Sequence, residues 1–456
     1  MDKMIQNTEK PNRGAMYRKA LSVAWPAMME SFFITLAGMI DTMMVAELGS
    51  YAVAAVGLTA QPKFVGLTLF MGINVAVSAL VARRKGEQRR DDAQEIVWTA
   101  ILLTLLLCVV VTVLFVVFAP QMMALAGSNA DTHDAAVQYF QIIMGGMFFN
   151  VVTMVINAAQ RGSGNTRLSM TTNLVSSIVN IIFNYLLIEG HFGFPAWGIQ
   201  GAAIATVLGT VVAAAMAFFS LFRPRSYVQF SAMRKLGIRI RKACVRSIWG
   251  LAGTSALENV AMRVGFVATA LIAARLGTDE FAAHNIGMNV LGLGFAFADG
   301  MQVAAIALAG EALGAGRKED AKAYGSVCQR IGFLISVLLS LALILGSEWF
   351  YGLYFTERHI IDMGLMISRW LTIIILLQIS QIIFTGCLRA AGDVRYTLFV
   401  GLVSVTGIRT LVTLLLVNVF HMGLTGVWLG ILSDQASRFI LMSHRFREGK
   451  WVDLKI

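Results

Sequence analysis

Apolar stretches of about twenty residues, separated by polar or glycine-containing breaks, recur along the whole chain. A helix of this length spans the hydrocarbon core of a bilayer. Of the 456 residues, 57% are hydrophobic and 14% are charged, and the mean hydropathy is +0.70, outside the usual range of soluble domains. The sequence therefore predicts an all-α integral membrane protein with twelve transmembrane helices. The expected spans are 18–48, 52–82, 95–119, 134–159, 167–189, 197–222, 246–275, 280–313, 322–346, 357–388, 396–419 and 423–444.

Basic residues recur in every second loop of this pattern. They follow the expected second, fourth and sixth helices, whereas residues 120–134 and 189–198 contain no Lys or Arg. By the positive-inside rule, both termini are expected to be cytoplasmic. The net charge of +11 thus reflects topology and predicts no nucleic-acid partner. Residues 1–13 lack the pattern of a cleavable signal peptide, so the first apolar segment is expected to be retained.

The two halves of the chain are related by an internal repeat. Displacing the sequence by half its length brings 161-RGSGNTR-167 onto 389-RAAGDVR-395, and it also aligns Gly72 with Gly300. Both hairpins follow the fourth helix of their half on the expected cytoplasmic side, so the sequence predicts two parallel six-helix lobes. Parallel repeats are an architecture of secondary transporters, with the solute path between the halves. The expected divisions are an N-lobe at residues 1–222, a cytoplasmic linker at 223–245, and a C-lobe with a cytoplasmic tail at 246–456.

These features, with 197-WGIQGAA-203 and 270-ALIAARLGTDEFAAHNIG-287, resemble the multidrug and toxic compound extrusion (MATE) transporters over about residues 16–444. The branch resembled includes the DNA-damage-inducible F-like proteins, whose first helix carries a proline and an aspartate, as Pro26 and Asp41 do here. The resemblance implies a cation-coupled antiporter, without a cofactor, that exports bulky and often cationic drugs by alternating access. We expect a monomeric multi-pass protein of a prokaryotic inner membrane, in contact with lipid.

Asp41 interrupts the apolar part of the segment 36-LAGMIDTMMVAELG-49, six residues before Glu47 near its end. An ionised carboxylate at the centre of a membrane helix costs roughly 2.5–3.5 kcal/mol on insertion scales, so Asp41 is not expected to face lipid. Helix directions bring four other polar side chains to its depth, which predicts a hydrogen-bonded network in the N-lobe. Burial disfavours the ionised carboxyl while amide and hydroxyl donors favour it, a balance that suits proton exchange near neutral pH. The other members are Asn180, Asn184, Tyr139 and Thr206.

The residues around Asp41 bear on the choice of coupling ion. In MATE proteins that resemble this chain, the positions of Asp41 and Asn180 are linked to proton or sodium coupling. This chain has Asn184 where relatives can carry a second acid, and Ala202 at the nearby sixth-helix position. A single carboxylate gives sodium a poorer cage of oxygen ligands, so the sequence favours protons over sodium. For the asparagines and Thr206, holding helices together is the alternative role.

Pro26 lies well inside the first expected helix. Its ring removes a backbone hydrogen bond and clashes with the preceding turn, so a kink is expected there. We interpret this kink as a hinge that lets the helix bend when the charge of Asp41 changes, and a static kink is the alternative.

The C-lobe carries a second set of charged residues inside its apolar stretches. Because the signs are mixed, mutual neutralisation in a structural ion-pair network is one interpretation. A second coupling site is the other, since a glutamate of helix 7 is implicated in cation binding in some MATE proteins that this chain resembles. The candidates are Glu258, Arg263 and Asp299, with Arg369 and Arg409.

The many Met and Phe residues, 24 and 28 in number, suit a polyspecific cavity because thioethers and rings adapt to varied apolar ligands. Such a cavity fits organic cations or amphipathic drugs. Lys63 either faces the cavity or extends outward along the membrane interface. The candidate lining residues are Met29, Phe33, Met39, Lys63 and Phe64.

Other classes of function fit the sequence less well. A flippase for a lipid-linked saccharide shares the repeat architecture, but it needs a basic cavity for pyrophosphate, and only Lys63 supplies a basic group in the N-lobe interior. An enzyme needs a catalytic set, and no HExxH, GxSxG or phosphate-loop motif occurs. The scattered cysteines fit neither a disulfide framework nor a metal site. A sodium-coupled multidrug exporter remains the other alternative, whereas the two-lobe repeat disfavours a channel.

Overall fold

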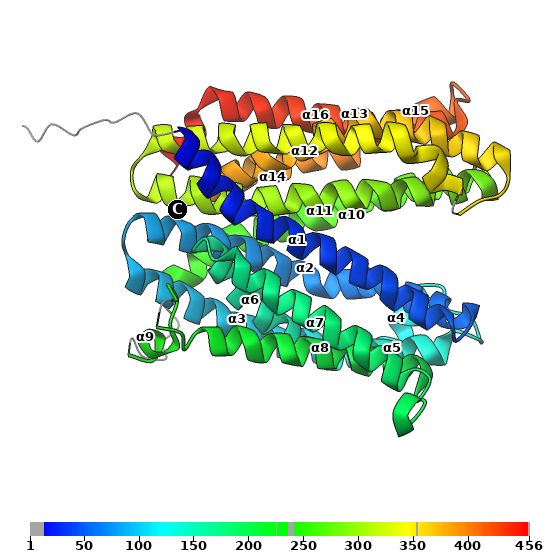
Figure 1. Cartoon of the computed structure of the whole chain (residues 1–456), viewed down its shortest axis with the longest axis horizontal. Coiled ribbons are helices and arrows are strands. Elements are labelled where there is room, and N and C mark those ends of the chain that lie inside the picture. The colour runs from blue at the N-terminus through cyan, green and yellow to red at the C-terminus, as the bar shows by residue number, and fades with distance from the viewer. Residues whose placement is uncertain (1–12, 225, 236–240, 353, 455–456) are drawn as a thin grey trace, which may run out of the picture.

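The computed structural model describes residues 13–224, 226–235, 241–352 and 354–454, and within these ranges it is helical without strands. Long helices run side by side along the molecule (Figure 1). The helices of the N-lobe are α1 (Arg13–Ala46), α2 (Ser50–Gly86), α3 (Arg90–Val117), α4 (Ala119–Leu125), α5 (His133–Gly145), α6 (Met147–Gly162), α7 (Thr166–Leu187) and α8 (Gly198–Ser220). Those of the C-lobe are α10 (Lys242–Ala274), α11 (Thr278–Gly314), α12 (Lys318–Gly352), α13 (Arg358–Ala390), α14 (Val394–Gly401), α15 (Thr410–Asn418) and α16 (Gly423–Glu448).

These helices make twelve membrane spans. In the described part of the chain, ten spans are long and apolar enough to cross a bilayer, with α14 and α15 forming one of them. The eleventh is the pair α5 and α6, bent by 46°, and the twelfth is α16. That helix has the length to span but is less apolar, because it carries Asp434 and Arg438, which bind each other inside the lobe.

Two expected helices differ from the simple prediction. The span expected at 134–159 is two helices that meet at Gly145 and Gly146. A Cβ atom on Gly146 would lie 2.5 Å from Val207, so α8 approaches too closely at the bend for a side chain there. The span expected at 396–419 contains a π-helical segment, Leu402–Arg409. Such segments are rare and often occur at functional sites.

The linker forms the short helix α9 (Phe230–Lys235), which packs on α3 through Phe230 and Trp98. Positions 225 and 236–240 of the expected linker lie outside the described residues. Two 3-10 segments, His191–Gly193 and Lys450–Asp453, complete the described structure.

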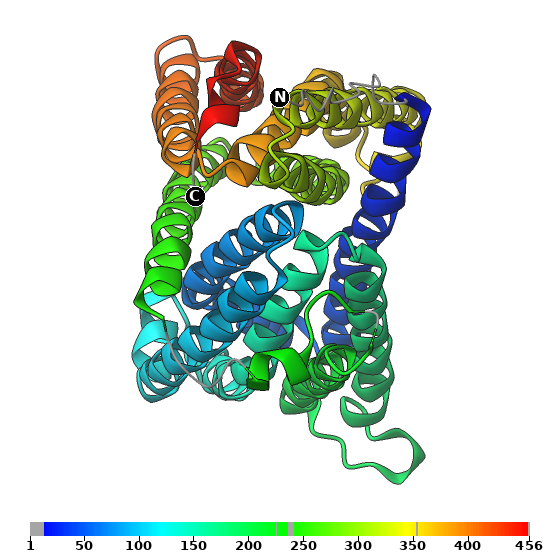
Figure 2. The same ribbon diagram turned by 90° about the vertical axis from the view of Figure 1, so that its left-hand side faces the viewer.

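The first helix of each lobe crosses into the other lobe. The first half of α1 lies in an apolar core with α11, α12 and α13, and the first half of α10 lies in a core with α2, α3, α6 and α8. Figure 2 shows these two helices on opposite sides of the molecule, each reaching from one lobe to the other. The packing therefore crosses the division expected between the lobes. The exchanged side chains are Met16, Ala20, Val23, Ala24 and Met28 of α1, and Ile248, Leu251 and Ala252 of α10.

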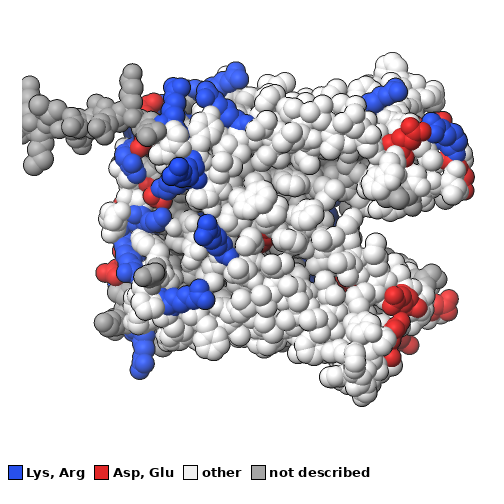
Figure 3. All heavy atoms as spheres, viewed as in Figure 1, with Lys and Arg blue, Asp and Glu red and all other residues white. Residues whose placement is uncertain are grey.

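Charge is distributed unevenly between the two ends of the molecule. Most Lys and Arg side chains in Figure 3 gather at the end that holds the start of α1, which we call the basic end. Asp and Glu are concentrated at the opposite, acidic end, where a hollow opens between the lobes. The lobes are thus separated at the acidic end and joined at the basic end.

Glycines allow the backbones of the two lobes to touch near the basic end. A Cβ atom on Gly86 of α2 would lie 1.9 Å from the carbonyl oxygen of Glu311, and one on Gly314 of α11 would lie 1.9 Å from that of Arg83. The half-length displacement of the repeat relates Gly86 to Gly314 and Arg83 to Glu311. The closure is therefore pseudo-symmetric, and it depends on small residues as close helix pairs in membranes do.

A second symmetric pair of glycines lies further along the same helices. A Cβ atom on Gly72 would lie 2.3 Å from the carbonyl oxygen of Ala252, and one on Gly300 would lie 2.4 Å from the backbone nitrogen of Met28. At these contacts the first half of α10 packs closely on α2, and the first half of α1 packs closely on α11. The alignment of Gly72 with Gly300 in the sequence thus marks equivalent interlobe contacts.

An ion-pair cluster adds to the closure of the basic end. Glu311 of α11 binds Lys19 of α1 and Lys85 of α2, with an Nζ–Oε distance of 2.9 Å in each case. Lys85 also donates to the carbonyl oxygen of Ser163, at 2.8 Å. One C-lobe carboxylate therefore connects two N-lobe helices.

Candidate functional site

Asp41 lies in the second half of α1, facing α7. Its carboxylate oxygen Oδ1 accepts a hydrogen bond from the side-chain amide of Asn184, which is fully buried. One turn earlier on α7, the Asn180 amide donates to the hydroxyl of Thr206 on α8, at 3.1 Å. The i, i+4 spacing places both asparagines on one face of α7, as expected. The structure thus brings four of the five predicted residues together as two hydrogen-bonded pairs across three helices.

The fifth predicted residue and Lys63 complete the surroundings of these pairs. Tyr139 of α5 is buried, packed in an apolar core with α2 and α8 residues. Lys63 lines a cavity of about 120 Å³ together with Thr206 of α8 and Asn150 of α6. Among the described residues, no side chain lies within ion-pair distance of the Lys63 ammonium. Lys63 therefore faces the inside of the N-lobe instead of the membrane interface.

A second carboxylate of α1, which sequence reasoning missed, has a different environment. Glu30 is 4% exposed and forms an ion pair with Arg161 of α6, at 2.9 Å. It also accepts hydrogen bonds from the Ser169 hydroxyl at 2.8 Å and from the Asn173 amide at 2.6 Å. Arg161 donates in addition to Asn74, at 3.0 Å. Glu30 is thus held by a cation and two neutral donors.

The C-lobe repeats this arrangement. Glu258 is 3% exposed; its Oε2 lies 3.1 Å from an Arg389 guanidinium nitrogen and accepts a 2.9 Å hydrogen bond from the Thr397 hydroxyl. The half-length displacement relates Glu30 to Glu258, Arg161 to Arg389 and Ser169 to Thr397. Comparing acidic residues across the repeat was the signal that would have revealed Glu30. The arginines are the first residues of the two hairpin motifs in the repeat.

Substitution of Glu30 by glutamine is expected to destabilise the protein. Removing one partner of a buried ion pair typically costs about 3–5 kcal/mol, because the other charge remains buried. We expect a clearly lower melting temperature for the purified protein in detergent. Glu189→Gln, which removes an exposed carboxylate at the acidic end, is the matched control. Its melting temperature should equal that of the wild-type protein. An unchanged melting temperature for Glu30→Gln would contradict a structural role for the pair.

Three charged residues form a buried ion-pair cluster deeper in the C-lobe. Asp434 of α16 binds Arg438 through two hydrogen bonds of 2.7 and 2.9 Å, and its Oδ2 lies 3.6 Å from Arg409. Arg409, at the end of the π-helical segment, also donates to Thr269 at 3.0 Å. The repeat displacement relates Thr269 to Asp41 and Asp434 to Thr206. The C-lobe therefore holds a carboxylate paired with arginine where the N-lobe has neutral groups around Asp41.

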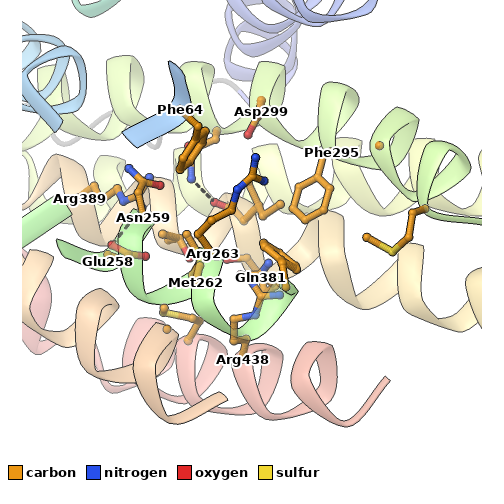
Figure 4. A pocket seen from close by; sticks show the side chains of 18 residues that line it. Phe64, Glu258, Asn259, Met262, Arg263, Phe295, Asp299, Gln381, Arg389 and Arg438 are labelled. Carbon is orange, nitrogen blue, oxygen red and sulfur yellow. Dashed lines mark hydrogen bonds and ion pairs between the residues drawn. The ribbon is translucent and has the colours of Figure 1, made fainter. Parts of the chain in front are cut away.

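A larger cavity of about 470 Å³ lies between the C-lobe helices and Phe64 of α2. Figure 4 shows its charged and aromatic lining residues. The expected set of Glu258, Arg263 and Asp299 does border this one cavity, but its members do not neutralise one another. Arg263 instead donates to Gln61 of α2 at 2.9 Å and lies over the Phe64 ring, 4.3 Å from its centre. Mutual neutralisation was one of the two interpretations of this set; Glu258 instead binds Arg389, from the far end of α13.

The other predicted residues occupy varied positions. Phe64 borders the larger cavity and Lys63 the smaller one, whereas Met29, Phe33 and Met39 line neither and are half-buried along α1. Pro26 is buried within an α1 helix that continues through it. It lies two residues before Met28, where α1 meets Gly300 of the other lobe.

Within the described residues, no group of three or more His, Cys, Asp or Glu side chains is arranged to hold a metal ion. The four cysteines are unpaired, and three of them are buried. The polar sites described above are therefore sets of hydrogen bonds and ion pairs within the membrane region.

Comparison with known proteins identifies the family. A family model described as MatE matches residues 26–186 and 254–415. "Probable multidrug resistance protein NorM" of Thermotoga maritima is 25% identical over 434 residues, covering 95% of this chain and 93% of that protein. A protein of the same description from Burkholderia pseudomallei is 30% identical over 421 residues, covering 89% and 87%.

Solved structures share the fold. A structure described as the outward-facing conformation of a multidrug resistance MATE family transporter of the MOP superfamily has a TM-score of 0.88 and 22% identity, covering 95% of this chain and 97% of that one. The two segments matched by the family model begin half a chain length apart, in register with the internal repeat. The chain therefore belongs to the MatE family, a family of membrane transporters and not of enzymes.

Proposed function

We propose that this protein is a proton-coupled antiporter that exports bulky organic cations from a prokaryotic cell. Multidrug efflux is supported by the descriptions of relatives such as "Multidrug resistance protein MdtK" of Yersinia enterocolitica, 26% identical over 446 residues. The larger cavity of about 470 Å³ is within the size range of sites for drug-like ligands. Its Met and Phe side chains suit ligands of varied shape.

The observation that carries proton coupling is the contrast between Asp41 and the three acids of the membrane region that are paired with arginine. Glu30, Glu258 and Asp434 each bind at least one arginine. Asp41 is hydrogen-bonded to a neutral amide instead. It can therefore gain or lose a proton without leaving an arginine unpaired.

The geometry around Asp41 favours a proton over sodium. Asp41 is the one carboxylate of this hydrogen-bonded set, whose other members are neutral. A sodium site needs several converging oxygen ligands, as for other hard cations, and Lys63 places a positive charge in the adjoining cavity. The coupling residues we propose are Asp41, Asn184, Asn180, Thr206 and Tyr139.

The charge distribution supports an orientation with the basic end in the cytoplasm. The hollow at the acidic end then faces outward, and both described termini lie on the cytoplasmic side. We infer that the protein is a monomer in the inner membrane. The N-lobe comprises residues 1–222 and the C-lobe residues 246–456 in this proposal. No cofactor is required in this proposal.

A flippase for lipid-linked saccharides is disfavoured because each arginine that lines the larger cavity already has a partner in the protein. Arg263 binds Gln61, Arg389 binds Glu258, and Arg438 binds Asp434. None of the three is free for a pyrophosphate group.

Transport into sealed proteoliposomes tests the proposal. An acidic lumen should drive uptake of ethidium, whereas a sodium gradient of the same size at equal pH should drive none. The expected signal is lumen alkalinisation that accompanies ethidium entry. Sodium-driven uptake at equal pH, without proton movement, would show that the coupling ion is sodium.

A further inference from the structure

The larger cavity contains one charge without a protein partner. Of the charged side chains that line it, Glu258, Arg389 and Arg438 are held in ion pairs, and Arg263 binds Gln61 and stacks on Phe64. The remaining charged residue is Asp299. Within the described part of the chain, no donor lies within hydrogen-bond or ion-pair distance of its carboxylate.

Asp299 is exposed to the space inside the cavity. It lies on α11, one residue before Gly300, where α1 crosses into the C-lobe. Figure 4 shows its side chain at the edge of the cavity near Phe64, with Phe295 on the same helix. The position is deep in the membrane region. A carboxylate in such a place is costly unless a cation joins it.

The cavity around this carboxylate has apolar as well as polar walls. Phenylalanine rings and thioethers form the walls, and rings attract cations through their faces as well as packing on apolar groups. The apolar side chains are Phe64, Met262, Phe266, Met288, Phe295, Ile382 and Met442. A ligand with one positive charge on an aromatic or aliphatic body matches both features.

We propose that Asp299 binds the positive centre of the transported compound and selects monovalent organic cations. This proposal rests on the proposed function, and it assigns substrate binding to the C-lobe while Asp41 exchanges the proton in the N-lobe. Three arginines border the same cavity. A dication would place its second charge among them without a free carboxylate, so dications are disfavoured.

Binding to the purified protein at fixed pH tests this assignment. Tetraphenylphosphonium carries a permanent charge, and N-phenyl-1-naphthylamine is a neutral aromatic compound. We expect Asp299→Asn to weaken tetraphenylphosphonium binding at least about tenfold and to change naphthylamine binding less than about twofold. Asp299→Glu should keep most of the affinity. Asp131→Asn removes an exposed carboxylate outside the cavity and should bind both compounds as the wild type does.

Charge rescue gives a second measurement that does not depend on the asparagine variant folding well. In a Cys244→Ala background, Asp299→Cys should bind tetraphenylphosphonium weakly, regain affinity with a negatively charged sulfonatoethyl thiol reagent, and stay weak with a trimethylammonium reagent. Equal binding by all these forms, or equal loss of the cation and the neutral compound, would overturn the proposal. Ethidium uptake by wild-type vesicles that is driven by a sodium gradient and not by a proton gradient would refute proton coupling only. It would leave the role of Asp299 standing, since the binding comparison does not involve a gradient.

Discussion

Asp41→Asn is expected to abolish proton-driven efflux in a protein that still folds. Asparagine has nearly the same volume and hydrogen-bonding reach but cannot ionise, so it resembles a permanently protonated side chain. The substitution removes the cost of a carboxylate in the membrane region, and insertion should not suffer. A site with one charge state cannot bias the equilibrium between the two conformations. Ethidium uptake driven by an acidic lumen should therefore fall to the level of empty vesicles.

Glu258→Gln is the comparison variant for this experiment. Because Glu258 is paired with Arg389, its loss should lower thermal stability more than it changes the number of protons exchanged per ethidium. Full proton-driven uptake by Asp41→Asn, with none by a stable Glu258→Gln protein, would place the coupling site in the C-lobe. The pH dependence of tetraphenylphosphonium affinity gives a further check. If protonation of Asp41 weakens binding of the cation, linkage requires that binding of the cation weakens protonation by the same free energy.

Gly86→Ala is expected to prevent closure of the basic end. The new methyl carbon would lie 1.9 Å from the carbonyl oxygen of Glu311 and 2.8 Å from the nitrogen of Ala315. Both atoms are backbone atoms at the end of α11 and cannot rotate away, so α2 and α11 must separate. Packed interfaces shift between discrete arrangements and do not deform continuously. The population should therefore move almost wholly to the state that is open at the basic end, with loss of transport.

Distances between spin labels on the basic ends of α2 and α11 would measure this shift. Gly57→Ala, in the same helix, is the matched control, because a Cβ atom there meets no atom within 4 Å. Gly314→Ala should reproduce the effect of Gly86→Ala, since its Cβ would lie 1.9 Å from the carbonyl oxygen of Arg83. Wild-type label distances and wild-type transport in both glycine variants would show that the closed arrangement is not part of the cycle.

The course of α1 offers a physical link between these two sites. Its second half carries Asp41 beside α7, and its first half lies in the C-lobe core and meets Gly300. We infer that a change of charge at Asp41 alters the packing of a helix that also belongs to the basic-end closure. Pro26 lies within the C-lobe part of α1, two residues before Met28, where a missing backbone hydrogen bond makes bending easier.

The sequence by itself determined the architecture. The bilayer requires about twenty apolar residues per helix, so composition and spacing reveal the spans. The paired hairpins beginning at Arg161 and Arg389 fixed the parallel repeat, because they recur on the same side of each half. Asp41 was also evident, since an ionisable residue in an apolar stretch needs a specific partner. The break at Gly146 and the π-helical segment were not evident, because both depend on contacts with neighbouring helices.

Only the tertiary structure decided which charges are neutralised and which are free. Glu30 and Arg161 are 131 residues apart, and nothing in their local sequence indicates that they meet. Glu258 and Asp299 seemed equivalent members of one charged set, yet one is paired with Arg389 and the other faces the cavity. The rotation of each helix about its axis is set by its packing against neighbours, through small residues and close contacts. Hydropathy shows that a residue is in the membrane, but only that packing decides what it faces.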